Sequence, residues 1–538
     1  MYRTRSATTC LKHLGIVAAF GLAFADQHAQ AQLTDLTQTP NPINAGIAKS
    51  LEEQVGSGQG DEVTPWSSIY LINRDPARAI RRGRQLFQRA FTGNQGLGPR
   101  VNADSIGDIT VNRAFGAGLT NSCASCHGRP RGSAGFGGDV VTRPDSRDAP
   151  HLFGAGLVEM IGDEMTRDLR KTRQRATAWS RWLEGPITLP LESKGIRFGR
   201  ITAYPNGRVD TSRVQGVDED LRVRPFFAQG GAFSLREFVV GAFKDEMGLE
   251  SVDPILCAAT DPYKPVPAVS PSGMTFDPKT DAMVRPAVCD PGIDGDDDGV
   301  VNEIDPALVD YMEFYLLNYF KPALGKQTSR TRHGQKLMKQ IGCTDCHTPN
   351  LEVDRDRRVA DVETRHDERN GIFNRLFATA TTQFDVVNDG QTLPKLVPRQ
   401  KSFVVENIYA DFRRHDLGPA YHEREYDGTY VREFMTEPLW GVGTTAPYGH
   451  DGRSINLEEA ILRHGGEAEA ARDAFAQLND NNQRKLIEFL QSLVLFPPDD
   501  TASNLHPGVP GSDNPQDPAK HGSINLGALF QDASEGAE

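Results

Sequence analysis

Two short cysteine motifs constrain this chain more than any other feature. Cys123-Ala-Ser-Cys126-His127 and Cys343-Thr-Asp-Cys346-His347 both read C-x-x-C-H. Two cysteines at i and i+3 can each form a thioether with one vinyl group of a haem, and the adjacent histidine then reaches the iron as its fifth ligand. A zinc knuckle would need a second cysteine pair close by, and a thioredoxin-like pair would need a βαβ context. The sequence therefore predicts two covalently bound c-type haems, one on each motif.

The first 31 residues have the pattern of a secretory signal. Arg3, Arg5 and Lys12 form a basic start, Leu14 to Ala25 an apolar core, and Ala29-Gln30-Ala31 a small-x-small cleavage site, with Ala23-Phe24-Ala25 as a competing site. No later stretch approaches the ~20 apolar residues of a membrane span. We therefore expect a periplasmic protein without an integral span, exported to the compartment where c-type haems are attached.

The remaining cysteines predict a disulfide. Of seven cysteines, one lies in the signal and four belong to the motifs, which leaves Cys257 and Cys289. In an oxidising compartment these two are expected to pair with each other. The alternative is two buried free thiols.

The charge balance limits the kinds of partner. The chain has 59 basic and 72 acidic residues, a net charge of −13. This balance argues against nucleic acid and anionic membranes as partners. It suits a redox protein that meets a small soluble electron donor, such as a cytochrome or a cupredoxin.

Patterning along the chain predicts a mainly α fold with two cytochrome c-like haem domains, long loops and an inter-domain insertion. Gly83, followed by Leu86 and Phe87, resembles Gly334, followed by Leu337 and Met338, and this forms a weak internal repeat ahead of the two motifs. The predicted segments are a signal peptide (1–31), a polar N-terminal arm (32–65), a first haem domain (66–250), an insertion (251–304), a second haem domain (305–498) and an acidic disordered tail (499–538).

The segment after the second motif offers a sixth iron ligand. Asn456 can cap a helix in which Leu457, Ile461 and His464 share an apolar face. A lone histidine on such a face is usually a core residue, but here an iron needs a ligand. We therefore favour His464, with His450 in the preceding loop as the rival.

These segments resemble a known family. Thr445-Ala-Pro-Tyr-Gly-His-Asp-Gly-Arg453 and Leu457-Glu-Glu-Ala460 are similar to the second haem domain of bacterial dihaem cytochrome c peroxidases. In that superfamily the sixth ligand lies 14 residues after the loop histidine, a position that falls on His464. A closer resemblance is to the dihaem oxidoreductase/peroxidase family, sometimes labelled thiol oxidoreductase. It rests on segments around Arg147–Glu159, Gly241–Leu249, His415–Gly418, Pro438–Gly441 and His464–Ala468. The resemblance implies a peroxidase-like fold.

The first haem is less defined by sequence. His151 is the nearest spare histidine and either caps the iron or packs against the haem edge. Cleavage of a peroxide O–O bond needs an acid–base group within reach of the oxygen. Glu159 is our candidate catalytic residue, with Asp163 and Glu164 as alternatives and a solvent-facing carboxylate as the simpler interpretation.

A third pattern predicts a calcium site. Oxygen ligands fall at positions 1, 3, 5, 7, 9 and 12 of a loop with glycine at position 6, the spacing of calcium loops. The residues are Asp294, Asp296, Asp298, Val300, Asn302 and Asp305, with Gly299 at position 6. A solvated acidic turn is the alternative. Trp179, Trp182 and Trp440 could relay electrons between the haems or simply pack in the core.

Together these features predict a periplasmic dihaem oxidoreductase of the peroxidase type. The second haem, closed by His347 and His464, would pass electrons to a reactive first haem on His127, where peroxide or dioxygen is reduced. A dihaem electron carrier without catalysis, a dioxygen-using dihaem oxygenase and an enzyme that oxidises a partner protein are the alternatives.

Overall fold

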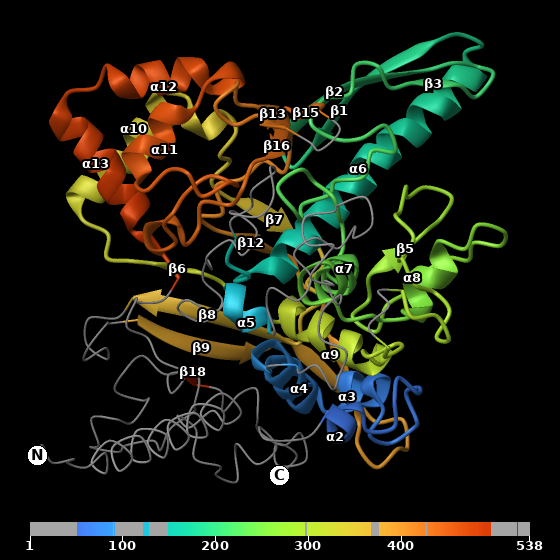
Figure 1. Cartoon of the computed structure of the whole chain (residues 1–538). Coiled ribbons are helices and arrows are strands. Elements are labelled where there is room, and N and C mark those ends of the chain that lie inside the picture. Colours follow the sequence, from blue (N-terminus) through green and yellow to red (C-terminus); the bar gives the residue numbers. More distant parts are fainter. Residues whose placement is uncertain are drawn as a thin grey trace, which may run out of the picture. The chain divides into compact units, whose positions relative to one another are not determined.

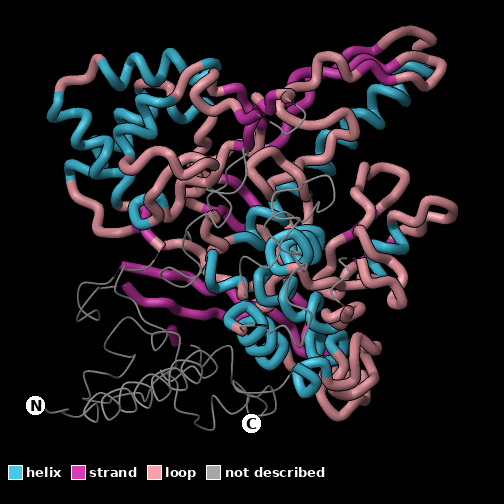
Figure 2. Tube along the Cα trace, in the orientation of Figure 1, coloured by secondary structure: helices cyan, strands magenta, loops and turns pink. Residues whose placement is uncertain are grey.

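The structure is a computed structural model, and it describes residues 51–89, 91, 122–127, 149–295, 299–366, 376–424, 428–495 and 524–525. The described residues belong to one compact unit, Leu51–Glu538. Figure 1 traces its helices and strands in chain order, and Figure 2 shows how much of it is loop. The signal peptide predicted for residues 1–31 lies outside the described residues. No described helix combines the length and hydropathy that a membrane span requires.

The helices are distributed over the whole described chain. They are α2 (Leu51–Val55), α3 (Ser68–Arg74), α4 (Pro76–Gln88), α5 (Cys123–His127), α6 (Ala155–Trp182), α7 (Leu235–Met247), α8 (Pro254–Ala259), α9 (Pro306–Leu317), α10 (Ser329–Gln340), α11 (Leu457–Arg463), α12 (Glu469–Ala476) and α13 (Asp480–Gln491). Short 3-10 helices cover Cys343–Asp345 (η2), Val442–Thr444 (η3) and Gly466–Ala468 (η4).

The strands form eight small sheets among the described residues. A three-stranded sheet has the order β1-β2-β3 (Ile187–Ser193, Ile196–Ala203, Val209–Asp210), and another has the order β18-β9-β8 (Ile524–Asn525, Leu376–Thr382, Ala360–His366). The two-stranded pairs are β4 (Ala268–Val269) with β5 (Thr275–Phe276), β6 (Ala323–Leu324) with β17 (Leu493–Val494), β7 (Leu351–Val353) with β12 (Phe403–Val405), β10 (Phe384–Val387) with β11 (Lys395–Pro398), β13 (Arg414–Asp416) with β16 (Glu433–Met435), and β14 (Glu423–Arg424) with β15 (Tyr430–Val431).

The prediction of a mainly α fold is wrong. Helices and small sheets alternate along the chain, and most of the strands are two to four residues long. Such short pairs are hard to see in a sequence because period-2 alternation needs at least four residues to stand out.

Helix ends follow local chemistry. Asp75 caps α4, with Pro76 at the first helical position, and Asp305 caps α9 ahead of Pro306 in the same way. Helix α7 begins after the Ser234 cap and ends at Gly248, whose φ of 64° suits glycine.

The internal repeat has a structural basis. Helix α4 packs on α9, and α10 packs on α13. At Gly83 an added Cβ would collide with the carbonyl of Tyr311, and at Gly334 with that of Lys485. Each glycine therefore lets two helix backbones approach closely. The bulky residues after each glycine are buried: Leu86, Phe87, Leu337 and Met338.

The packing of α9 bears on one predicted boundary, which stays a prediction. Helix α9 was assigned to the second haem domain, which was expected to begin at residue 305. The structure packs α9 against α3, α4 and α7, which precede it in the chain. The second domain has its own smaller core, formed by residues such as Leu337, Tyr409 and Phe489.

The chain ends also differ from expectation where they are described. Within the polar arm predicted for residues 32–65, residues 51–55 form α2, and the Gln59 side chain donates to Asp310 on α9 at 3.1 Å. Within the tail predicted to be disordered, residues 524–525 form β18, which pairs in parallel with β9.

Candidate haem-binding sites

The first motif forms a short helix that positions its histidine. His127 ends α5, and its Nδ1 lies 2.7 Å from the carbonyl oxygen of Pro150. A carbonyl can only accept, so Nδ1 carries the proton and Nε2 keeps its lone pair. An imidazole held in this way is oriented to bind a metal through Nε2.

The second motif repeats this arrangement. Cys343 and Asp345 bound η2, and Nδ1 of His347 lies 3.0 Å from the carbonyl oxygen of Tyr409. Burial lowers the pKa of His347 to about 4, the Tyr409 carbonyl opposes this shift, and nearby His464 lowers it further. The His347 ring is therefore neutral, as an iron ligand must be.

The motif cysteines fit haem attachment better than thiol redox chemistry. Cys123, Cys126, Cys343 and Cys346 form no disulfide among the described residues. Burial raises the pKa of the Cys123 thiol to about 12 and that of Cys343 to about 11. A redox-active thiol needs a lowered pKa, because the thiolate is the reacting species. A cysteine that is already joined to a haem by a thioether bond needs no lowered pKa.

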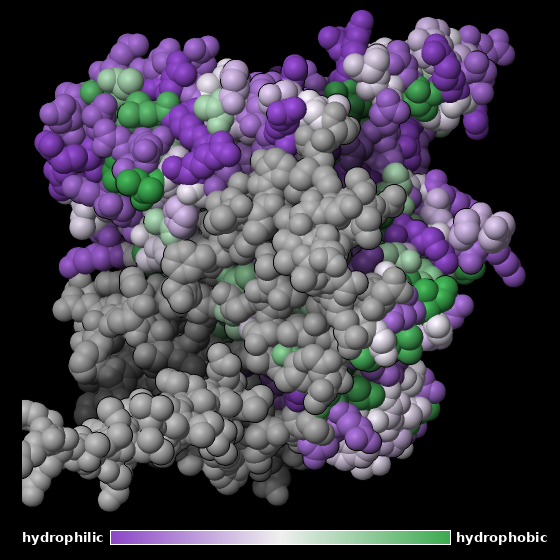
Figure 3. Space-filling model, in the orientation of Figure 1, coloured by the Kyte–Doolittle hydropathy of each residue, from purple (hydrophilic) through white to green (hydrophobic). Residues whose placement is uncertain are grey.

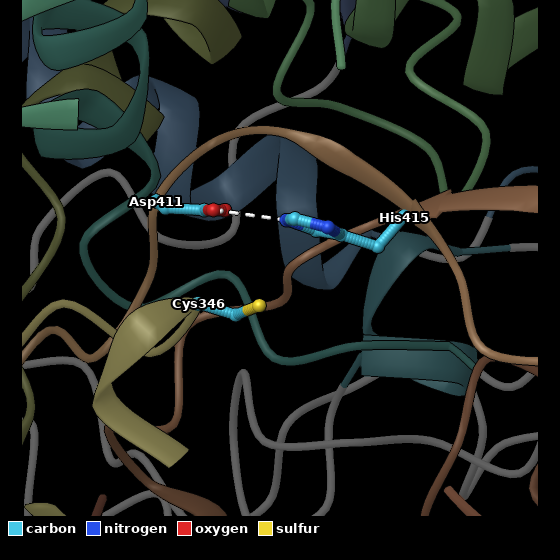
Figure 4. Close-up of side chains that lie close together, drawn as sticks. All are labelled: Cys346, Asp411 and His415. Carbon is cyan, nitrogen blue, oxygen red and sulfur yellow. Dashed lines mark hydrogen bonds and ion pairs between the residues drawn. The ribbon is translucent and has the colours of Figure 1, made fainter. Parts of the chain in front are cut away.

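A cluster beside the second motif could be mistaken for a metal site. Figure 4 shows Cys346, Asp411 and His415, whose ligand atoms lie within 4.8 Å of one another. His415 Nε2 lies 2.9 Å from Asp411, and its Nδ1 lies 2.8 Å from Glu467. Because each ring nitrogen faces a carboxylate, the imidazole is held as a cation and offers no lone pair. Burial opposes this, but Asp411 and Cys346 raise the pKa of His415 to about 11. We interpret the cluster as a buried ion pair next to Cys346 of the second motif.

The predicted sixth ligand is presented like the two motif histidines. His464 caps the C-terminus of α11, and its Nδ1 lies 2.7 Å from the Ala460 carbonyl oxygen, which leaves Nε2 for a metal. The charge of His464 also lowers the pKa of His347. The Asn456 cap is present as expected, because its side chain accepts from the Glu459 amide.

The rival histidine has other partners. His450 Nε2 lies 2.9 Å from Oε1 of Glu423, and its ring stacks on Phe434 with centroids 4.0 Å apart and an interplanar angle of 7°. These contacts favour His464 over His450 as the ligand. The ligation itself stays a prediction.

His151 follows the residue that orients His127. Its neighbour Pro150 accepts from Nδ1 of His127. His151 Nε2 itself lies 2.9 Å from the carbonyl oxygen of Trp440. The two roles expected for His151, iron ligand and packing at the haem edge, both stay predictions.

Glu159 is placed in a buried ion pair. The residue, on the first turns of α6, has no exposed surface. Its Oε1 lies 2.5 Å from Nη2 of Arg357, and its Oε2 accepts from the Leu235 amide at 2.6 Å. Of the alternatives, Glu164 is also paired, with Lys194 at 2.8 Å, and Asp163 pairs with Arg222 at 3.2 Å. The acid–base role of Glu159 stays a prediction.

The calcium loop is only partly described, because residues 296–298, which include Asp296 and Asp298, lie outside the described residues. Gly299 has a φ of 91°, as position 6 of such a loop requires. Asp305 caps α9 by accepting from the Ala307 amide, and the Asn302 side chain accepts from the Val252 amide. Both predicted ligands thus already bind backbone amides through one oxygen.

The remaining predicted residues are placed as follows. Cys257 and Cys289 form a disulfide with Cα atoms 5.7 Å apart. Trp179 and Trp182 are exposed, which does not suit a relay between haems. Trp440 is buried and packs its ring against Gly154.

Sequence reasoning missed the groups that orient the motif histidines. The carbonyls of Pro150 and Tyr409 carry no sequence signal, because every residue has a carbonyl. Asp411, the partner of His415, was not predicted either. The sequence pointed only to His415, as part of a segment that resembles the family.

The comparisons with known proteins agree with the resemblance predicted above. Residues 350–493 match the protein family described as "Di-haem oxidoreductase, putative peroxidase". The resemblance is therefore confirmed over this segment, which contains His415, His450 and His464 and begins just after the second motif. No curated protein matches the chain.

Two solved structures are similar at a low level. A MauG-like protein associated with microbial copper homeostasis is 13% identical, with a TM-score of 0.24, and the match covers 74% of this chain and 92% of that one. Hydrazine synthase of Kuenenia stuttgartiensis is 16% identical, with a TM-score of 0.22, over 37% of this chain. This chain spans 59% of the length of that hydrazine synthase chain.

Proposed function

We propose that this protein is a periplasmic dihaem c-type oxidoreductase that reduces a peroxide. The match to a di-haem oxidoreductase family supports the enzyme class at a coarse level. Two C-x-x-C-H motifs with identically oriented histidines support two covalent haems. When bound, such haems supply iron centres that store and transfer single electrons.

We assign different roles to the two sites. His347 and His464 would hold the second iron from both sides, which suits electron transfer. His127 would hold the first iron, and we assign the reaction with peroxide to this site because its sixth ligand is not defined by the sequence. Reduction of hydrogen peroxide to two waters consumes two electrons and two protons, and two haems can supply both electrons.

One observation carries the proposed electron relay: a chain of hydrogen bonds joins the two motif histidines. His127 contacts the Pro150 carbonyl at 2.7 Å, and the next residue, His151, contacts the Trp440 carbonyl at 2.9 Å. The residue before Trp440 continues the chain, since the amide of Leu439 donates to Ile408 at 3.0 Å.

The chain closes at the next residue, Tyr409, whose carbonyl accepts from His347 at 3.0 Å. Four hydrogen bonds and three peptide units thus connect the two imidazoles. This path runs through backbone groups and the His151 side chain, and it would couple the two sites.

The remaining parts of the proposal are a stabilising calcium ion and an electron donor. A calcium ion in the loop from Asp294 to Asp305 would brace the start of α9. A small soluble cytochrome or cupredoxin would donate electrons to the second haem. The alternatives to the peroxidase are an enzyme that uses dioxygen and a protein that only transfers electrons.

Haem content and turnover test this function together. The intact protein should contain two haems by mass and by pyridine haemochrome, and Cys126→Ala and Cys346→Ala should each remove one. The loaded protein, reduced by an external donor, should be reoxidised by hydrogen peroxide with two electrons consumed per peroxide. Two haems without peroxide turnover would leave a carrier or a dioxygen-using enzyme, whereas a variant that keeps both haems would contradict the motif assignment.

A further inference from the structure

An arm built from the outer half of α6 and the strands β1–β3 is set apart from the rest of the fold. The first turns of α6 are buried on nearly every side, whereas beyond Arg167 only one face is covered. That face carries Leu169, Thr172, Ala176 and Ser180. The strands β1–β3 make their main contacts with one another and with α6. Figure 1 shows this arm as a projection at the upper right.

Strands β1 and β2 form a hairpin that defines the base and the tip of the arm. Its turn lies at the base, because Lys194 Nζ is 2.8 Å from Glu164. Its open end lies at the C-terminus of α6, because Ile187 pairs with Ala203 there. Ala155, the first residue of α6, comes shortly after the first motif in the chain. At 1.5 Å per residue, Trp182 at the other end of the helix lies about 40 Å from Ala155.

The arm is basic although the chain is acidic. Residues 167–213 contain eleven basic residues and four acidic ones, in a chain with a net charge of −13. Figure 3 shows the surface of the arm mostly in hydrophilic colours. Since charges in salt are screened beyond about 10 Å, a partner at the arm meets this local charge and not the net charge.

The outer arginines are available to a partner. At the base, Arg170 and Lys194 pair with carboxylates. Six exposed arginines further out form no ion pair with any described residue: Arg175, Arg181, Arg197, Arg200, Arg208 and Arg213. Only Glu184, Glu192 and Asp210 offset them on the outer arm.

Large apolar side chains stand at the tip. Trp182 is 79% exposed, Leu183 55% and Trp179 45%. Tyr204, near the tip, lies under the Arg208 guanidinium at 4.0 Å. Exposed tryptophans next to arginines match the chemistry of a membrane interface, where an indole ring sits at the headgroup level and cations meet anionic lipid.

We propose that this arm binds the surface of an anionic lipid membrane, with Trp182 and Leu183 entering the headgroup layer. A protein partner would need a matching surface of roughly 800 Å². The arm instead offers a narrow tip, which a deformable lipid surface accommodates more readily. The role is peripheral attachment, and it does not depend on the peroxidase assignment.

Vesicle co-sedimentation of the haem-loaded protein tests this proposal. We expect binding to phosphatidylcholine vesicles that contain phosphatidylglycerol, weakened by salt, and little binding to phosphatidylcholine alone. Replacing Arg181 or Arg208 by Gln should weaken binding about fivefold each, from ~1 kcal/mol per basic residue near the surface. Trp182→Ser with Leu183→Ser should weaken it further, whereas Tyr263→Ser should not, although Tyr263 is 94% exposed.

Three results would overturn the proposal. The first is absence of binding to the anionic vesicles, and the second is equal binding to neutral vesicles. The third is a concentration-dependent dimer that dissociates in the arm variants, without any vesicle binding. That result would make the acidic surface of a second copy the partner of the arm. Haem content of each variant shows that the fold is retained.

Discussion

His151 donates from Nε2 to the carbonyl oxygen of Trp440 at 2.9 Å, across 289 positions of sequence. The contact joins the segment that orients His127 to the segment that reaches Tyr409 and His347. Among the links of this chain outside the motifs, it is the one that a side-chain substitution can remove, because the others are made by backbone groups.

Replacing His151 should slow electron transfer between the haems. His151→Phe keeps a ring of similar size but removes the donor to Trp440, so we expect slower equilibration of the two haems after partial reduction, with both haems retained. Flash photolysis of the half-reduced protein measures this rate. His422→Phe is the matched control, since His422 is also half-buried with one ring contact, to Asp416 at 2.7 Å. An unchanged rate in His151→Phe would remove this path from the account.

The second haem should depend on His464. In His464→Ala the low-spin signal of this haem should become high-spin or water-ligated, because one axial imidazole is lost. His450→Ala should leave the spin state unchanged, since its ring is engaged by Glu423 and Phe434. Electron paramagnetic resonance of the oxidised variants separates the two, and the reverse pattern would make His450 the ligand.

Glu159→Gln should act first on stability. The substitution leaves Arg357 with an uncompensated charge, and breaking a buried pair typically costs about 3–5 kcal/mol. Denaturant unfolding of the haem-loaded protein measures this loss, which adding Arg357→Gln should partly restore. If Glu159 is instead the acid–base group, folded Glu159→Gln should lose ~10²-fold or more in peroxide turnover while reduction of both haems stays normal.

Removing calcium should destabilise the protein. Saturating calcium at a hundred times its Kd would contribute about 2.7 kcal/mol, so a chelator should lower Tm and added calcium should restore it. Asp294→Ala combined with Asp298→Ala should reproduce the chelated state and abolish its response to calcium. An unchanged Tm on chelation, with no calcium by elemental analysis, would contradict the predicted loop.

Sequence reasoning reached the local features and missed the long-range ones. The motifs, the Asn456 cap and the helices around Gly83 and Gly334 follow from short patterns. The packing of α9 on α4 could not be predicted, because α4 lies more than 200 residues earlier and periodicity does not identify the partner of a helix. Glu467 beside His415 and the carbonyls that orient His127 and His347 likewise come from other segments, 52, 23 and 62 positions away.

The mainly α prediction failed for a related reason. Two-residue strands such as β14 and β15 are defined by the backbone of their partner and not by their own side chains. The ion pair of Glu159 was also hidden, because Arg357 lies 198 positions away.

The central claim is that the two haems differ, with one closed by two histidines and the other open to peroxide. An optical titration of the fully reduced protein, first with hydrogen peroxide and then separately with dioxygen, tests this claim most directly. We predict one low-spin haem that does not bind either oxidant and one high-spin haem that reacts with peroxide, with both haems oxidised after one equivalent. Two low-spin haems that peroxide leaves reduced, or a reaction with dioxygen alone, would contradict it.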